Sequence, residues 1–377
     1  MVYDGGYFMK KQSWKLAAAL SLAAALLTGC GSSAQTADST EAVSAQSSQA
    51  ASEQTEDTQS TEAEESKAEQ AEDTADGSIS IMAMKGPTAM GMVQLMDEAD
   101  QGKITDASYK FSIVASPDEV TPKLVQGGAD IAAVPANLAA VLYNNTEGGI
   151  QTLAINTLGI LYIVENGDTV HTAADLKGKT IYASGKGATP EYTLNYILKE
   201  NGIDPEKDVK IEWKSEHAEC VAALEADPVG IAMLPQPFVT TAQMKNPKLR
   251  VALDLTKEWD ALQKEGTASS ALLTGVVVAR TEFIKEHPEE VAAFLDRYEA
   301  SVNYVNAHVD EAAALVGKYD IVPEAVAKKA IPACSIVYIA GPEMKEKLSG
   351  YLSVLYEQNP KAVGGKLPGD DFYYGVE

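Results

Sequence analysis

Small and polar residues follow several short apolar runs of the sequence, at places where they could bind a ligand. Gly86 and Thr88 follow the run that ends near residue 84, and Gly187 and Thr189 follow a similar run. Glycine lets a ligand approach the backbone closely, and hydroxyl groups both donate and accept hydrogen bonds. These residue types suit the binding of a small polar molecule.

Sequence motifs for catalysis and metal binding are absent. The sequence has no GxSxG, HExxH or P-loop pattern, and its four histidines are scattered. Three cysteines without a CxxC pair give neither a disulfide scaffold nor a zinc motif. His217 is expected at the surface, as is usual for a lone histidine in a loop. We therefore expect no enzyme activity, no metal and no cofactor.

The composition bounds the class of protein and its partners. The chain has 377 residues, 45% of them hydrophobic, which fits a globular protein of two or three domains. Its formal net charge is −24, and its only arginines are Arg250, Arg280 and Arg297. Binding to nucleic acid requires clustered Lys and Arg side chains, so we exclude a nucleic-acid partner.

Short apolar runs alternate with helical patterns from residue 78 onward. This alternation predicts an α/β fold with mainly parallel sheets. Thr189 is expected to be the N-cap of a helix that starts at Pro190. The expected strands are 78–84, 109–114, 131–135, 179–183, 209–213, 231–235 and 270–279, and the expected helices are 89–98, 190–201, 282–306, 310–317, 323–330 and 342–357.

Three sequence matches recur in the same order at an offset of about 100 residues. One of them pairs the Ile-Ala-x-aliphatic-Pro runs at 131–135 and 231–235. The repeat predicts two similar lobes, and one long doubly wound sheet remains the alternative. We assign 78–162 and 272–377 to lobe one and 163–271 to lobe two. The chain then crosses between the lobes twice, which forms a two-stranded hinge.

The N-terminal residues predict export from the cytoplasm. Residues 1–29 combine early lysines with the uncharged run Leu16–Leu27, which is short of the ~20 residues that span a bilayer. The sequence Leu27-Thr28-Gly29-Cys30 resembles a bacterial lipobox, and the resemblance implies that Cys30 carries a lipid with acyl chains such as palmitate. The alternative is an ordinary signal peptide with a chance cysteine. Either Met1 or Met9 is the start.

Residues 30–77 are predicted to be the lipidated cysteine and a disordered acidic tether. The segment 31–77 holds twelve acidic residues against one lysine and no aromatic residue. Such a segment cannot bury enough apolar surface to offset its ordering entropy. We expect it to hold the folded part away from the extracytoplasmic face of a bacterial cell membrane.

Several phrases resemble those of extracytoplasmic solute-binding proteins of ABC importers, which have the type II periplasmic-binding fold. The run Asp175-Leu176-Lys177-Gly178-Lys179 resembles a motif that is common in these proteins. Residues 185–189 and 275–298 resemble the nitrate/taurine/sulfonate and thiamine-precursor branch of the family. The resemblance covers roughly 79–377. It implies a lipoprotein receptor that captures a ligand between two lobes and delivers it to permease subunits. The alternatives are a ligand sensor for a receptor kinase and an enzyme like those of the menaquinone pathway.

A ligand is expected between the lobes, beyond the carboxyl ends of the strands. Each hydroxyl and amide there could instead cap a helix or face solvent, and each aromatic ring could belong to the core. The candidate ligand-binding residues are Lys85, Gly86, Thr88, Ser116, Asn137, Gly187, Ala188, Thr189, Trp213, Gln236 and Phe238.

The candidate loops contain no arginine, which disfavours a bidentate clamp on a sulfonate or phosphate. We therefore expect a neutral or weakly anionic organic ligand, with a heteroaromatic ring as one candidate. Cys220 and Cys334 could form a disulfide outside the cytosol, but their apolar surroundings favour buried free thiols. The protein is expected to be a monomer.

Overall fold

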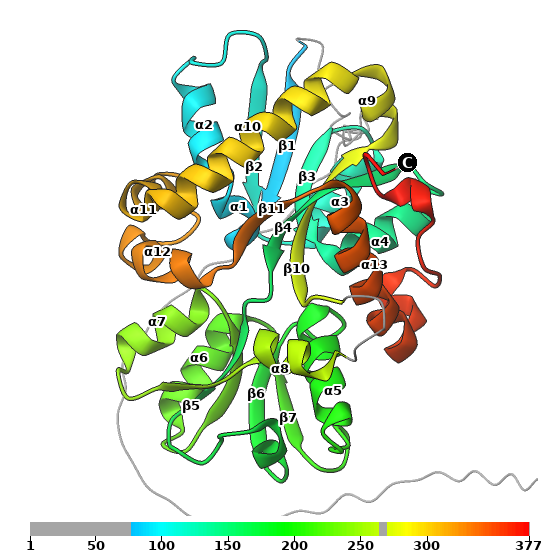
Figure 1. Cartoon of the computed structure of the whole chain (residues 1–377). Coiled ribbons are helices and arrows are strands. Elements are labelled where there is room, and N and C mark those ends of the chain that lie inside the picture. Colours follow the sequence, from blue (N-terminus) through cyan, green and yellow to red (C-terminus); the bar gives the residue numbers. More distant parts are fainter. Residues whose placement is uncertain (1–76, 264–269, 377) are drawn as a thin grey trace, which may run out of the picture. The chain divides into compact units, whose positions relative to one another are not determined.

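The computed structural model describes residues 77–263 and 270–376. The predicted leader, Cys30 and acidic tether lie outside these residues. Within them the strands form two sheets, each packed between helices, so the chain has the predicted two-lobe α/β fold (Figure 1). Lobe one is built on the six-stranded sheet and lobe two on the five-stranded sheet.

The strands of lobe one are β1 (Ile79–Met84), β2 (Tyr109–Val114), β3 (Ile131–Pro135), β4 (Ile150–Leu158), β10 (Leu273–Arg280) and β11 (Ile336–Ile339). The strands of lobe two are β5 (Leu161–Glu165), β6 (Thr180–Ser184), β7 (Lys210–Lys214), β8 (Ile231–Pro235) and β9 (Arg250–Asp254).

The helices of lobe one are α1 (Pro87–Met90), α2 (Val93–Asp100), α3 (Pro117–Val125), α4 (Ala136–Asn145), α9 (Thr281–Glu286), α10 (Pro288–Ala307), α11 (Val309–Lys318), α12 (Glu324–Ala330) and α13 (Gly341–Gln358). The helices of lobe two are α5 (Thr189–Glu200), α6 (His217–Ala226), α7 (Phe238–Lys245) and α8 (Leu255–Leu262). Short 3₁₀ turns are η1 (Ala173–Leu176), η2 (Ile331–Ala333), η3 (Pro360–Val363) and η4 (Asp370–Phe372).

The strand orders confirm the predicted repeat. The sheet of lobe one runs β11-β4-β10-β3-β1-β2, and that of lobe two runs β9-β5-β8-β6-β7. In each sheet a parallel trio is followed by an antiparallel strand, which is β10 beside β3 and β5 beside β8. Because β4, β5, β9, β10 and β11 all pair antiparallel, the expectation of mainly parallel sheets holds only for the two trios.

One apolar cluster is continuous from lobe one to lobe two. It includes Ile155 and Tyr351 of lobe one together with Ile181, Leu194 and Trp259 of lobe two. A second cluster lies on the other face of the lobe-one sheet, under α2, α10 and α11, and a third lies under α6 and α7. Burial of apolar surface therefore joins the lobes on the side where α13 meets α5 (Figure 1).

The single helix expected over 89–98 is wrong, because the chain forms α1 and α2 with a break at Gly91. A Cβ atom at Gly91 would lie 3.2 Å from side-chain atoms of Tyr298 and Val302 in α10. Ser301 fills the break, since its Oγ donates to the Gly91 carbonyl and accepts from the Leu95 N–H. Tertiary packing on α10 thus interrupts a helix that the apolar spacing favours.

The helix expected over 282–306 also divides, into α9 and α10, at His287. Pro288 has no N–H group and disfavours the helical conformation of the residue before it. His287 accordingly has φ −130° and ψ 51° and serves as the cap between the two helices.

Candidate ligand-binding site

A cavity of about 180 Å³ lies between the two lobes, at the carboxyl ends of β1, β3 and β8. It is lined by residues of both lobes and of the first crossover, Ile160 and Leu161. Six of the candidate residues named from the sequence line it: Lys85, Gly86, Thr88, Thr189, Gln236 and Phe238.

The other candidates lie elsewhere. Ser116 is the N-cap of α3 in a capping box with Glu119. Gly187 is exposed, and its N–H donates to Glu191. Ala188 is the N-cap of α5, so the prediction that Thr189 caps this helix is wrong. Pro190 follows at the second helical position and makes an early helix start favourable.

The two threonines of the cavity use their hydroxyl groups differently. Thr88 donates to the carbonyl of Met84 over 2.6 Å and does not cap α1. Thr189 accepts a hydrogen bond from Tyr351 and donates to Oδ1 of Asn137, which is buried directly behind the cavity. Both side chains are therefore fixed by the protein before any ligand arrives.

Two further polar groups at the cavity are available to a ligand. Gln236 is buried, and its Oε1 accepts hydrogen bonds from the backbone and hydroxyl of Thr240, which leaves its amide N–H groups to donate. Thr274 lines the cavity from β10, and its buried hydroxyl has no hydrogen-bond partner among the described residues. Gln236 can donate to a ligand from its present position, whereas the enclosed Thr274 hydroxyl needs a local shift to reach one.

His217 lines the cavity, so the expectation of a surface histidine is wrong. Its Nδ1 lies 2.5 Å from the hydroxyl of the buried Ser184, and its ring centroid lies 5.0 Å from that of Phe238. Burial lowers the pKa of His217 to about 4, so the ring is uncharged at neutral pH. A signal was available in the sequence, because His217 opens the helix that follows a strand of the repeat.

The cavity is weakly charged. Lys85 is its only ionisable lysine or arginine among the described residues, and Lys85 Nζ pairs with Asp320 at 3.0 Å. No carboxylate of the described chain lines it. The first residues of α5, α6 and α7 all line the cavity, and helix N-termini present unpaired N–H groups with partial positive charge. This environment favours a neutral ligand with acceptor atoms or a singly charged anion.

Rings cover much of the cavity wall. Pro87 and Pro135 contribute from lobe one, and Pro190, Pro235 and Pro237 contribute from lobe two. The pyrrolidine rings make the wall largely apolar, and the aromatic rings of Phe238 and His217 present flat faces that suit a planar ligand.

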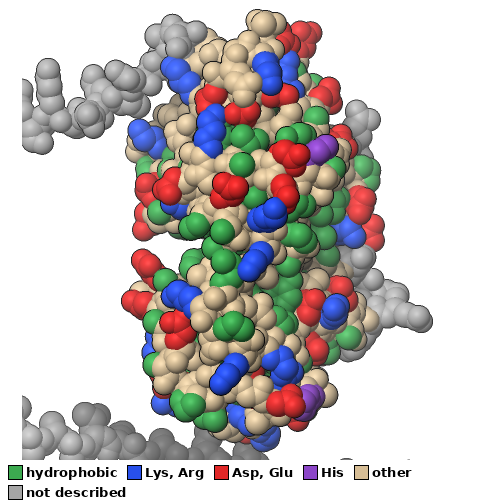
Figure 2. All heavy atoms as spheres, turned by 90° about the vertical axis from the view of Figure 1, so that its left-hand side faces the viewer, with side chains coloured by type: hydrophobic (Ala, Val, Ile, Leu, Met, Phe, Trp, Pro, Cys, Tyr) green, Lys and Arg blue, Asp and Glu red, His purple; other side chains and the backbone are tan. Residues whose placement is uncertain are grey.

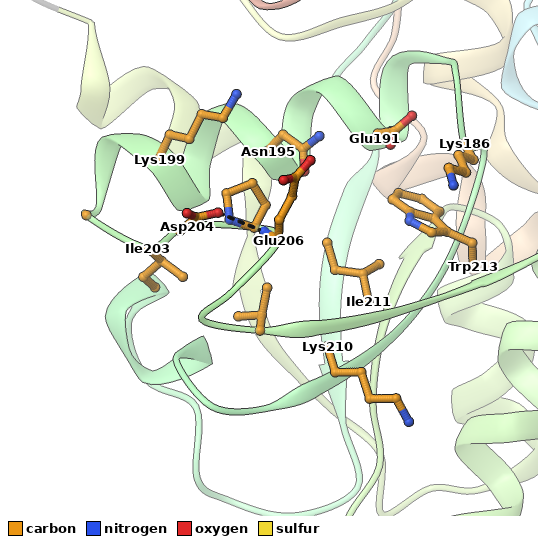
Figure 3. A pocket seen from close by; sticks show the side chains of 13 residues that line it. Lys186, Glu191, Asn195, Lys199, Ile203, Asp204, Glu206, Lys210, Ile211 and Trp213 are labelled. Atoms are coloured by element: carbon orange, nitrogen blue, oxygen red, sulfur yellow. Dashed lines mark hydrogen bonds between the residues drawn. The ribbon is translucent and has the colours of Figure 1, made fainter. Parts of the chain in front are cut away.

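Trp213 lies at a different place, an open groove of about 990 Å³ on the outside of lobe two. Figure 3 shows this groove between α5 and β7, with Trp213 and Ile211 on the strand and Asn195 and Lys199 on the helix. Lysines and carboxylates alternate around it, and Lys186 is one of them. The structure therefore does not bring Trp213 to the cavity between the lobes.

Cys220 and Cys334 are both buried and free, as expected. Among the described residues no three His, Cys, Asp or Glu side chains are grouped to hold a metal ion. None of the helices in this part of the chain is long and apolar enough to cross a bilayer.

Solved structures share the fold. An ABC transporter protein from Parabacteroides distasonis is 25% identical, with a TM-score of 0.66 over 79% of this chain and 99% of that one. The periplasmic aliphatic sulphonate binding protein SsuA from Escherichia coli is 14% identical, with a TM-score of 0.63 over 78% and 95%. The desulfurization enzyme DSZB is 12% identical, with a TM-score of 0.54 over 74% and 92%.

The sequence itself supports the same assignment. None of the curated proteins matches the chain. The model of the family described as NMT1/THI5 like matches residues 112–312, which is just over half of the chain and includes parts of both lobes. The predicted resemblance to ABC solute-binding proteins is thereby confirmed, and the chain belongs to the NMT1/THI5-like family.

Proposed function

We propose that the protein is an extracytoplasmic receptor that captures a small organic solute and delivers it to the permease of an ABC importer. The cavity lined by both lobes carries this proposal, because a ligand there contacts both halves of the molecule. The family and the fold of the solved ABC-transporter proteins support the same role. The protein then performs no covalent chemistry, and it acts by binding and release.

The proposed ligand is neutral or weakly anionic and planar, with a heteroaromatic ring as one candidate. The ring-lined walls, the amide of Gln236 and the hydroxyl of Thr274 support this choice. The absence of arginine from the lining argues against a strongly anionic group. Although SsuA is an aliphatic sulphonate binding protein, it is only 14% identical to this chain, so the similarity shows a shared fold and not a shared ligand.

A thermal-shift screen tests the ligand and the site together. Vitamins, pyrimidines, simple sulfonates and nitrate are each added to the protein, because a ligand that binds only the native state raises the melting temperature. A compound that raises the melting temperature of the wild type should not do so in Q236L, but should still do so in W213A, since Trp213 lies in the outer groove.

Two outcomes contradict the proposal. A hit that depends on Trp213 but not on Gln236 places binding in the outer groove. Tight calorimetric binding of taurine or sulfate, with none of any pyrimidine, overturns the proposed ligand chemistry.

We also propose that Cys30 anchors the chain to the membrane through a lipid. The proposal rests on the lipobox-like residues that precede Cys30 and on the acidic segment that follows it. Metabolic labelling with a palmitate analogue should mark the wild-type protein and C220A but not C30A. Equal labelling of C30A would rule out the anchor.

We propose further that 78–162 and 272–377 move as one body against 163–271. Rotation about the two crossovers would close the cavity over its ligand and exclude water.

A further inference from the structure

Helix α13 contacts both lobes, although it follows the last strand of lobe one. It lies against α4 and β4 of lobe one and against α5 of lobe two. Figure 1 shows α13 on the right of the molecule, reaching toward α5 and α8. The two covalent crossovers are thus joined by a third, noncovalent connection between the lobes.

Hydrogen bonds link the lobes through this helix. The hydroxyl of Tyr351 donates to Thr189 Oγ1 over 3.0 Å, and Thr189 donates to Asn137 Oδ1 over 3.4 Å. The Asn137 amide donates in turn to the Ala362 carbonyl, 3.5 Å away. Tyr351 belongs to lobe one, Thr189 to lobe two and Asn137 to lobe one. The chain of bonds therefore crosses the boundary between the lobes twice.

Burial makes these bonds costly to break. Tyr351 is fully buried, and Thr189 and Asn137 are 3% and 8% exposed. A buried donor or acceptor that loses its partner keeps the full cost of its desolvation. Separation of α13 from α5 would break the Tyr351–Thr189 bond and leave the buried Tyr351 hydroxyl unpaired unless water entered.

Aromatic packing surrounds the same contact. Trp259 of α8 is fully buried, with its ring centroid 5.7 Å from that of Tyr351 and 4.6 Å from that of Tyr196. At the end of α13, Gln358 donates to the backbone carbonyl of Tyr192 over 3.0 Å. Helix α13 thus holds α5 at two points along its length.

Thr189 connects this contact to the ligand cavity. It is the first residue of α5, and it lines the cavity between the lobes. Its hydroxyl is the atom that accepts from Tyr351. Any movement of α5 relative to α13 therefore also moves a wall of the cavity.

We propose that Tyr351 is a positioning residue and that α13 acts as a latch between the lobes. The bond from Tyr351 to Thr189 holds the first turn of α5 at the cavity and favours the arrangement of the lobes that the structure describes. The inference extends the proposed function, since it concerns a wall of the proposed ligand site, but it requires no knowledge of the ligand.

Hydrogen–deuterium exchange of the ligand-free full chain tests the latch. We expect Y351F to raise exchange of amides near the start of α5 by roughly fivefold, the factor that corresponds to loss of one net hydrogen bond. Y356F is the matched control, because Tyr356 lies on the same helix and its hydroxyl has no hydrogen bond to the described residues, and it should exchange like wild type. The central strands β3 and β8 should keep their protection in both variants.

Two results would overturn the latch. One is unchanged exchange in Y351F, and the other is an equal rise in every element, which indicates global destabilisation alone. A double-mutant cycle guards against the second case, because Y351F should add no further opening in a T189V background. Additive effects in that cycle would show that Tyr351 does not act through Thr189. Failure of the ligand screen would leave this exchange result unaffected, so the two proposals fail separately.

Discussion

His217 is half-buried at the edge of the cavity, and its ring is neutral. The Ser184 hydroxyl occupies its Nδ1, and no described residue bonds its Nε2. The ring can therefore offer Nε2 to a ligand while it packs against Phe238. Its low pKa follows from burial, which penalises the imidazolium form.

The pKa of His217 predicts a pH dependence of stability. An unfolded histidine takes up a proton below about pH 6.5, whereas folded His217 does so only near pH 4. The unfolded state binds more protons in between, so stability is lost as the pH falls from about 6.5 to about 4. Between pH 7 and pH 5, wild type should lose about 1–2 kcal/mol more unfolding free energy than H217Q.

Urea denaturation of both proteins at the two pH values measures this difference. The contributions of the other titrating groups to the pH dependence are the same in both proteins and cancel in the comparison. H171Q serves as the control because the side chain of His171 is exposed. If H217Q and wild type lose equal stability, His217 is not held neutral by the fold.

Part of the site was predictable at the level of residues. Gly86, Thr88 and Gln236 follow strand ends, and strand ends in α/β sheets converge on one edge. Trp213 could not be placed, because its strand β7 is the edge strand of the sheet and one sequence does not show the order of the strands. Thr274 and Tyr351 come from segments beyond the repeat, whose position depends on tertiary packing.

At the scale of elements, the sequence predicts those helices and strands that are determined by local residue patterns. The predicted strand and helix types of the repeated units are confirmed, because apolar periodicity and the Gly and Pro residues that end an element act locally. The breaks at Gly91 and His287 differ in origin. Pro288 makes the second one readable from the sequence, whereas the first depends on Ser301 of a distant helix.

The contact of α8 with α5 and α13 predicts a large effect of truncation at Trp259. W259A should lower the free energy of unfolding by about 3–5 kcal/mol, because it leaves a cavity in the apolar cluster that joins the lobes. Chemical denaturation measures the change. W213A is the matched control, since Trp213 is only half-buried at the outer groove, and it should cost much less. Similar losses in both variants would argue against a shared core across the lobes.

At the scale of the whole molecule, the surface carries charges of both signs. Figure 2 shows acidic and basic side chains spread over one face, with hydrophobic side chains gathered between its upper and lower parts. The formal charge of −24 belongs partly to the segment 31–77, with its twelve acidic residues and one lysine. Net charge therefore says little about the ligand.

Closure of the lobes predicts a change in size on binding. A verified ligand should lower the radius of gyration measured by small-angle X-ray scattering, since rotation about the crossovers brings the lobes together. The same ligand added to Q236L at a concentration that gives no thermal shift should leave the scattering unchanged. A bound ligand that leaves the wild-type radius unchanged would contradict the hinge.

The position of β10 has a consequence for biosynthesis. This strand lies between β3 and β4 in the middle of its sheet, yet it is made only after every strand of the other sheet. As the chain emerges, lobe two is contiguous and can fold as a unit, while lobe one must wait with a gap at its centre. Truncated nascent chains that end near residue 262 should therefore protect the 161–254 region from protease while 79–158 remains cleavable.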